Sequence, residues 1–177
     1  MPKLSHSVLQ VLCALAIAAT PAMSEAQGEK AMDLPKSVHV RITALSEQGD
    51  KLASQAKYRE AILKYLEAMA LLPEPKTQWQ ACTWLLAAIG DANFLGGNYE
   101  QAQAALSDAM RCPGAIGNPF IHLRLGQTQF ELGNRSRAAD ELARAYMAEG
   151  KEIFSAENPK YFEFLKTVLK PPASGQW

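Results

Sequence analysis

Hydrophobic residues recur with the same helical spacing in three stretches of the chain, residues 54–69, 95–110 and 131–146. In each stretch, positions separated by three, four and three residues fall on one face of a helix, and two of the four hold Ala. The positions are Tyr58, Ala61, Tyr65 and Ala68; Tyr99, Ala102, Leu106 and Ala109; and Arg135, Ala138, Leu142 and Ala145. The pattern predicts three helices that each pack closely against a neighbour.

A second helix is predicted before each of these three, and each of the added helices contains a glycine: Gly49, Gly90 or Gly126. A glycine inside a helix costs about 1 kcal/mol relative to Ala. Three such glycines at equivalent positions indicate close helix crossings. The chain is therefore expected to form three helical hairpins separated by loops rich in Pro or Gly, at residues 71–80 and 111–120.

One more helix is predicted after the third hairpin. Asn158 followed by Pro159 is a helix-start signal. An apolar face follows, formed by Tyr161, Phe162, Leu165 and Leu169. This helix is expected to cap the last hairpin. Residues 171–177 are expected to form an extended tail, with Trp177 available to fold back onto the domain.

The first 26 residues differ from the rest of the chain. An apolar run of twelve residues, 8–19, is shorter than the roughly 20 residues that a membrane-spanning helix needs, and small residues that include Ser24 and Ala26 follow it. This pattern predicts a signal peptide over residues 1–26, a linker over 27–40 and a helical domain over 41–170. The mature protein would then be periplasmic or secreted, without membrane insertion. The alternative is a cytoplasmic protein whose translation starts at Met32.

The hairpin pattern from about Ile42 to Gly150 resembles the tetratricopeptide repeat (TPR). The matching residues are Leu45, Gly49, Leu52, Ala61, Tyr65, Ala68 and Pro73; Leu86, Ile89, Gly90, Ala102, Leu106 and Ala109; and Leu125, Gly126, Ala138, Leu142 and Ala145. The resemblance implies an all-α fold, a right-handed solenoid of three hairpins with a C-terminal capping helix. The chain departs from the repeat at Asn93 and Gln129, where an aromatic residue is usual, although Phe94 and Phe130 follow directly.

Three phrases of the sequence are also similar to a group of small bacterial TPR proteins. They are TQWQACTWLLAAIGDANF, CPGAIGNPFIHLRLGQ and NPKYFEFLK. Some members of that group are encoded beside polymorphic toxins. This resemblance implies a toxin-neutralising role as one interpretation.

The net charge, the histidine spacing and the motif content argue against several classes of function. The chain has 18 acidic and 18 basic residues, so no net charge favours nucleic acid. Its three histidines, His6, His39 and His122, have no second ligand at metal-binding spacing. No catalytic or cofactor-binding motif is present. We therefore expect no enzymatic activity, no cofactor and no metal.

The resemblance implies that the first helices of the hairpins line a concave groove that binds a protein or a peptide. The groove candidates are Trp84, Asp91, Phe94, Phe120, Arg124, Gln127 and Phe130. Asp91 and Arg124 are expected on adjacent helices, where they pair with each other or with a partner. The alternative is that the aromatic rings pack between helices. Chaperone-binding TPR domains hold carboxylates with a Lys, Asn and Arg clamp, of which only Arg124 matches here; the other places hold Ser46, Asp50, Ala88 and Phe120.

Two functions follow from these observations. The first is a protein-interaction module, with toxin neutralisation or an envelope scaffold as specific roles. The second is a structural subunit of a larger assembly, whose groove is filled by its own tail.

Two cysteines are predicted near adjacent helix ends. Cys82 lies near the start of one helix of the second hairpin, and Cys112 lies just past the end of the other. They are candidates for a disulfide in an oxidising compartment. The alternative is two buried thiols that act as small apolar side chains.

Overall fold

The computed structural model describes residues 34–171, 175 and 177. The predicted signal peptide, residues 1–26, lies outside this range, as does the first half of the predicted linker, residues 27–33. Within the described residues the protein is entirely helical, with no strand. Its α-helices are α2 (Lys36–Ser54), α3 (Tyr58–Ala70), α4 (Gln80–Leu95), α5 (Tyr99–Ala109), α6 (Pro119–Glu131), α7 (Arg135–Glu149) and α8 (Pro159–Val168); two 3-10 turns are η1 (Lys76–Gln78) and η2 (Gly150–Phe154).

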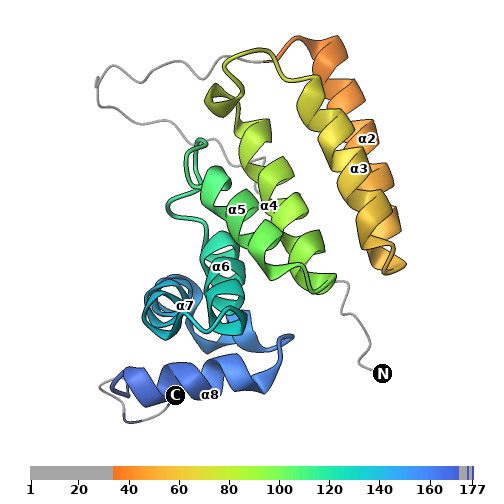
Figure 1. Ribbon diagram of the computed structural model, residues 1–177. Coiled ribbons are helices and arrows are strands. Elements are labelled where there is room, and N and C mark those ends of the chain that lie inside the picture. The colour runs from red at the N-terminus through yellow and green to blue at the C-terminus, as the bar shows by residue number, and fades with distance from the viewer. Residues whose placement is uncertain (1–33, 172–174, 176) are drawn as a thin grey trace, which may run out of the picture.

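The helices form three consecutive antiparallel hairpins, α2–α3, α4–α5 and α6–α7 (Figure 1). Each hairpin packs against the next, through α3 on α4 and α5 on α6, and α8 covers the end of the stack. We call α2, α4 and α6 the first helices and α3, α5 and α7 the second helices. The predicted all-α stack of three hairpins with a capping helix is confirmed.

The three helix glycines lie where the two helices of a hairpin cross. A Cβ atom added to Gly90 would lie 2.5 Å from Leu106 Cγ. One added to Gly126 would lie 2.8 Å from Leu142 Cγ and 2.9 Å from the Leu142 backbone nitrogen. At Gly49 the added atom would meet the ring of Tyr65. The close crossings predicted from the sequence are confirmed.

Asn93 and Gln129, the two residues that depart from the repeat pattern, have buried side chains that are hydrogen-bonded. Asn93 Nδ2 donates to the backbone oxygen of Ile89 at 2.9 Å. Asn134 Nδ2 donates to Gln129 Oε1 at 2.8 Å. Each polar side chain therefore meets a partner within its own hairpin, which avoids the cost of an unsatisfied buried group.

The start of the helical domain differs from the prediction. Helix α2 begins at Lys36, directly after Pro35, so residues 36–40 are helical although they were expected to belong to a linker. Leu34 and Val38 pack against the hydrophobic cluster of the first hairpin. This burial stabilises the added helical turn, because tertiary packing of an apolar face contributes most of the stability of protein helices.

The two cysteines meet at one end of the second hairpin. The Cα atoms of Cys82 and Cys112 are 6.0 Å apart, with the two Sγ atoms facing each other. A bridge requires a Cα separation below about 7 Å, so the backbone permits it without movement. The disulfide itself stays a prediction.

None of the described helices combines the length and the apolar character that a membrane crossing requires.

Candidate binding site

The candidate binding residues lie on one face of α4 and α6, which we call the first-helix face. A buried guanidinium stands at its centre. Arg124 of α6 is 3% exposed, and its Nε lies 2.6 Å from Asp91 Oδ1 of α4, an ion pair rather than an aligned hydrogen bond. Its Nη1 donates to Gln127 Oε1 at 2.7 Å. The predicted pairing of Asp91 with Arg124 is therefore present.

A second carboxylate reaches the same guanidinium from the connection between η2 and α8. Arg124 Nη1 and Nη2 donate to Glu157 Oε2 and Oε1 at 3.2 Å and 3.3 Å. Gln127 Nε2 donates to Glu157 Oε2 at 3.0 Å. Glu157 is thus held by a paired guanidinium contact, the geometry that makes Arg specific for carboxylates.

Two of the four aromatic candidates, Phe94 and Phe130, pack against helix α8. The ring of Tyr161, which is 4% exposed, lies 6.4 Å from the Phe94 ring and 5.4 Å from the Phe130 ring between centroids. The Phe164 ring lies 5.1 Å from that of Phe130, in an edge-to-face arrangement. Residues 157–164 therefore cover this part of the first-helix face, and we call them the capping segment.

A further polar contact fastens the capping segment to the end of α6. Tyr161 Oη donates to Glu131 Oε1 at 2.6 Å, and Lys160 Nζ lies 2.6 Å from the same oxygen. Burial alone would raise the pKa of Glu131, but the hydrogen bonds from Lys160 and Tyr161 outweigh it and hold that pKa below its ordinary value. Burial, together with the Glu131 carboxylate, raises the pKa of the Tyr161 hydroxyl. Glu131 is therefore charged and Tyr161 neutral at neutral pH.

One buried cation faces two carboxylates at the centre of this site. Burial raises the pKa of Asp91, with Arg124 opposing the rise and the negative charge of Glu157 adding to it. Burial would lower the pKa of Arg124, but attraction by Asp91 and Glu157 outweighs it and raises that pKa. The guanidinium remains charged, and its planar face also lies over aromatic rings, with Cζ at 4.6 Å from the Phe94 centroid and 5.5 Å from that of Phe120.

The structure brings four of the other candidates, Asp91, Phe94, Phe120 and Gln127, together around Arg124, but they do not line an open surface. Phe94 and Phe120 are 9% and 8% exposed, and Gln127 is fully buried. Phe130 is half-buried beneath Tyr161 and Phe164. At Phe94 and Phe120 the rings thus pack among the helices, which is the alternative that the sequence left open.

Trp84 belongs to a different part of the face. It is half-buried and packs against the cluster formed by α2, α3 and α4. It has no ring contact with the capping segment among the aromatic pairs of the described residues. Trp84 therefore lies outside the region covered by the capping segment. Phe120, which packs in a separate cluster of α4, α5 and α6, has no ring contact with that segment among these aromatic pairs either.

The tail does not occupy the first-helix face at its terminal residue. The Trp177 ring packs on Tyr146 of α7 and Phe162 of α8, with centroids 5.7 Å and 5.8 Å away. Its backbone oxygen accepts a hydrogen bond from Lys151 Nζ at 3.4 Å. The hypothesis that Trp177 fills the groove is wrong for this structure, because the side chains that hold it belong to α7, η2 and α8.

Sequence reasoning missed the residues that contact the site from the capping segment. Tyr161 was predicted only as part of an apolar face, and Glu157 was not considered. The signal that was present is the Asn158–Pro159 helix start, which is confirmed: α8 begins at Pro159, and Asn158 Oδ1 accepts from the Lys160 backbone nitrogen at 3.0 Å. This start places Glu157 just before the N-cap residue of the helix, but the contact with Arg124, 33 residues earlier, could not be predicted from a local sequence pattern.

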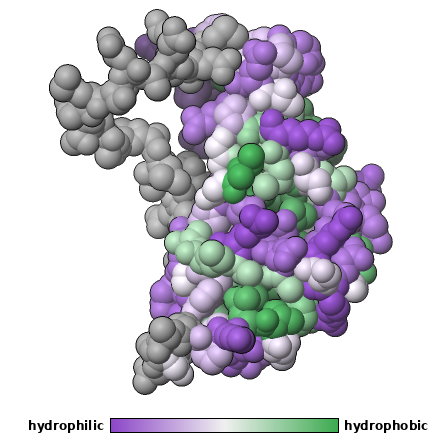
Figure 2. All heavy atoms as spheres, turned by 90° about the vertical axis from the view of Figure 1, so that its left-hand side faces the viewer, coloured by the Kyte–Doolittle hydropathy of each residue, from purple (hydrophilic) through white to green (hydrophobic). Residues whose placement is uncertain are grey.

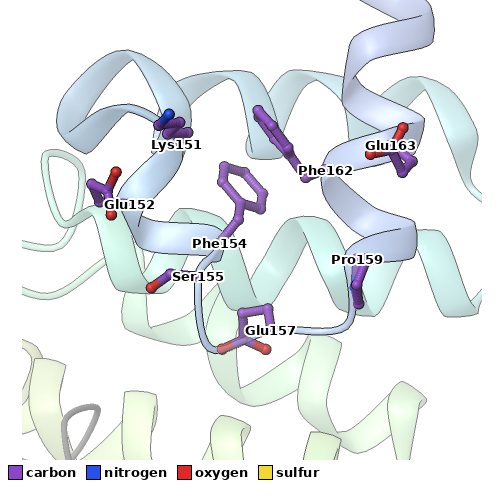
Figure 3. A pocket seen from close by; sticks show the side chains of 8 residues that line it. All are labelled: Lys151, Glu152, Phe154, Ser155, Glu157, Pro159, Phe162 and Glu163. Atoms are coloured by element: carbon purple, nitrogen blue, oxygen red, sulfur yellow. The ribbon is translucent and has the colours of Figure 1, made fainter. Parts of the chain in front are cut away.

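A pocket of about 320 Å³ lies beside the capping segment, between η2 and α8 (Figure 3). Its lining residues are Lys151, Glu152, Phe154, Ser155, Glu157, Pro159, Phe162 and Glu163. In Figure 3 the rings of Phe154 and Phe162 lie next to each other at its wall, with 5.1 Å between their centroids. Glu157 lines the pocket and also contacts Arg124, so the pocket adjoins the buried ionic cluster.

In the described part of the chain, no group of three or more His, Cys, Asp or Glu residues is arranged to hold a metal ion.

Comparison with known proteins gives matches among solved structures. No protein-family model matches the chain, and no curated protein sequence is a match. The first TPR domain of the human RPAP3 protein is 21% identical, over 72% of this chain and 89% of that domain, with a TM-score of 0.56. The first TPR of Spaghetti (RPAP3), bound to the HSP90 peptide SRMEEVD, is 20% identical, over 73% and 90%, with a TM-score of 0.56.

The second TPR domain of human RPAP3, in complex with the HSP70 peptide SGPTIEEVD, is also similar to this chain. It is 19% identical, over 76% of this chain and 99% of that domain, with a TM-score of 0.57. Identities at this level establish the architecture and leave the ligand open. Together with the three glycine crossings, they show that the chain has the fold of a tetratricopeptide-repeat domain.

Proposed function

We propose that the chain is a non-enzymatic protein-interaction module that binds a protein or peptide segment on its first-helix face. One observation carries the proposal: this face already holds a peptide segment, the capping segment of the same chain. It does so with a paired guanidinium–carboxylate contact at Glu157 and with aromatic packing around Tyr161. The chemistry of the face is therefore that of a peptide receptor.

The partner differs in chemistry from the peptides in the similar solved structures. Two of those TPR domains hold peptides that end in EEVD. Of the clamp positions in this chain only Arg124 matches, so the set of Lys, Asn and Arg groups that holds a chain-terminal carboxylate is incomplete. Asp50, at another clamp position, accepts a hydrogen bond from Tyr65 Oη at 2.8 Å. A free carboxylate terminus is therefore not the ligand that this face favours.

Two more specific roles are compatible with this proposal. Neutralising a toxin or serving as an envelope scaffold would each use one face to hold one protein partner. Both roles would suit a periplasmic or secreted protein, which the apolar segment before residue 26 favours. The structural-subunit alternative is favoured by one observation, namely that the capping segment closes part of the face in cis.

The Trp84→Ala variant tests the proposal. Large rings dominate interface hot spots, and truncating one costs about 2 kcal/mol or more of binding free energy. We expect affinity capture from the native host, followed by titration of the captured partner, to show at least roughly 30-fold weaker binding. Because Trp84 is only half-buried, the melting temperature of the variant should fall slightly, by much less than the truncation of a fully buried ring would cause.

Met147→Ala is the matched control for this experiment. Met147 is 83% exposed on α7, outside the first-helix face, so its truncation should change neither binding nor melting. A large fall in the melting temperature of the Trp84→Ala variant would show that Trp84 belongs to the core. Unchanged binding would place the interaction elsewhere.

Other exposed hydrophobic side chains are dispersed over the fold. They are Val40, Leu63, Leu66, Leu95, Ile116, Met147 and Val168. On the face that Figure 2 presents, hydrophobic residues form separate small patches among hydrophilic ones. The surface therefore offers no stronger competing indication of an interface on that side.

A further inference from the structure

The capping segment meets the first-helix face through side chains that a separate helix could also present. Glu157 lies two residues before the start of α8 and reaches Arg124. Tyr161 follows four residues later and packs between Phe94 and Phe130. Both contacts come from one short run of chain. The face is therefore complementary to a helix that carries a carboxylate at its start and an aromatic ring about one turn further on.

The attachment of the capping segment has features of a contact that can open. A pocket of about 320 Å³ adjoins η2 and α8 on the exposed side of the segment, while the rings of Phe154 and Phe162 stay in contact at 5.1 Å between centroids (Figure 3). The connection to α7 begins at Gly150, whose φ of 68° is in the left-handed region and whose missing Cβ would meet no atom within 4 Å. Hinges in proteins are a few residues at the ends of elements that absorb such backbone changes.

We propose that the capping segment is a self-bound ligand, which a partner's amphipathic helix displaces by presenting a carboxylate to Arg124 and an aromatic ring to Phe94 and Phe130. This inference rests on the proposed function and identifies the class of its partner. The partner is an amphipathic helix, not an extended peptide with a free carboxylate terminus.

The displacement is energetically feasible because a carboxylate of the partner would replace the carboxylate of Glu157. Removing Glu157 without replacement takes away a charge-assisted contact from a guanidinium that is 3% exposed. A partner that supplies its own carboxylate keeps Arg124 fully paired throughout. The tethered segment competes at an effective concentration in roughly the millimolar range, so the partner must make contacts beyond those of α8. The half-buried Trp84, outside the covered region, is placed to supply one.

A fluorescent peptide with the sequence of residues 155–170 tests the inference on the full chain. Glu157→Gln weakens the tethered copy, so we expect the peptide to bind this variant at least about tenfold more tightly than the original chain. Glu163→Gln is the matched control, because Glu163 is on the same helix but pairs with Lys166 at 2.7 Å and not with Arg124. It should bind the peptide as the original chain does.

Two further measurements make the result specific. A peptide with Gln in place of its Glu157 should bind the Glu157→Gln protein about tenfold more weakly than the original peptide, because the guanidinium then lacks a carboxylate. Amide hydrogen exchange in residues 159–168 of the protein should speed up when peptide binds, because α8 leaves the face. Lys160→Ala, which removes the contact to Glu131, is a second way to weaken the tethered copy if Glu157→Gln does not fold.

Equal peptide affinity for the three proteins, or binding without faster exchange in α8, would overturn the inference. So would the absence of binding to a folded Glu157→Gln or Lys160→Ala protein. The failure would leave the proposed function intact if host-partner binding still depends on Trp84. Loss of that dependence, by contrast, would overturn the proposed function.

Discussion

Replacing Arg124 with Met should lower the free energy of unfolding by about 3–5 kcal/mol, because removing one partner of a buried ionic cluster leaves the others without compensation. The Asp91 and Glu157 side chains would face each other across the vacated site, and they are only 17% and 12% exposed. Met keeps most of the apolar part of the Arg side chain, so the loss of unfolding free energy mainly measures the contribution of the guanidinium charge. Equilibrium denaturation in urea would measure it.

Arg111→Met is the control for this prediction. Arg111 also pairs with an aspartate, Asp108 at 3.5 Å, but its side chain is 76% exposed. Exposed pairs contribute about 0–1 kcal/mol, so this substitution should be nearly silent. Adding Asp91→Asn and Glu157→Gln to Arg124→Met should recover part of the lost stability. An Arg124→Met protein as stable as the original chain would show that Asp91 and Glu157 do not depend on the Arg124 charge for compensation.

The Gly126→Ala substitution should destabilise the protein by about 1–3 kcal/mol, the usual cost of overpacking. Helix propensity alone predicts the opposite sign, since Ala is favoured over Gly by about 1 kcal/mol inside a helix. The steric effect should win because the new Cβ would lie 2.9 Å from the backbone nitrogen of Leu142, which cannot rotate away as a side chain can. Thermal or urea denaturation would give the sign directly.

Gly117→Ala provides the comparison for this glycine. Gly117 lies in the loop before α6, where an added Cβ meets no atom within 4 Å. Its replacement should leave stability close to that of the original chain. A stabilising effect of Gly126→Ala would contradict the close crossing of α6 and α7.

The hairpins were predictable because their defining contacts are short in sequence and repeated. Each glycine meets a residue 16 positions later, as Gly90 meets Leu106 and Gly126 meets Leu142, so the same spacing occurs in every unit. The start of α2 was less predictable, because no strong capping residue precedes Lys36. Its first turn depends on tertiary packing of Leu34 and Val38, which a local pattern does not reveal.

The binding site was predictable only in part. The positions of Asp91 and Arg124 follow from the repeat spacing, and their pairing was one of two expected outcomes. The contact of Arg124 with Glu157 depends on how the chain turns through η2 between α7 and α8. That turn carries no periodic signal, so the sequence indicated a capping helix without indicating which residues it would cover.

Amide hydrogen exchange on the full chain, with and without its host partner, tests most directly whether the first-helix face is the binding surface. If the first-helix face binds the partner, the amides of α4 and α6 around Trp84 and Arg124 should become more protected from exchange. Outward-facing amides of α3, α5 and α7 should change little. Protection confined to these second helices, with α4 and α6 unchanged, would show that the partner does not bind the first-helix face.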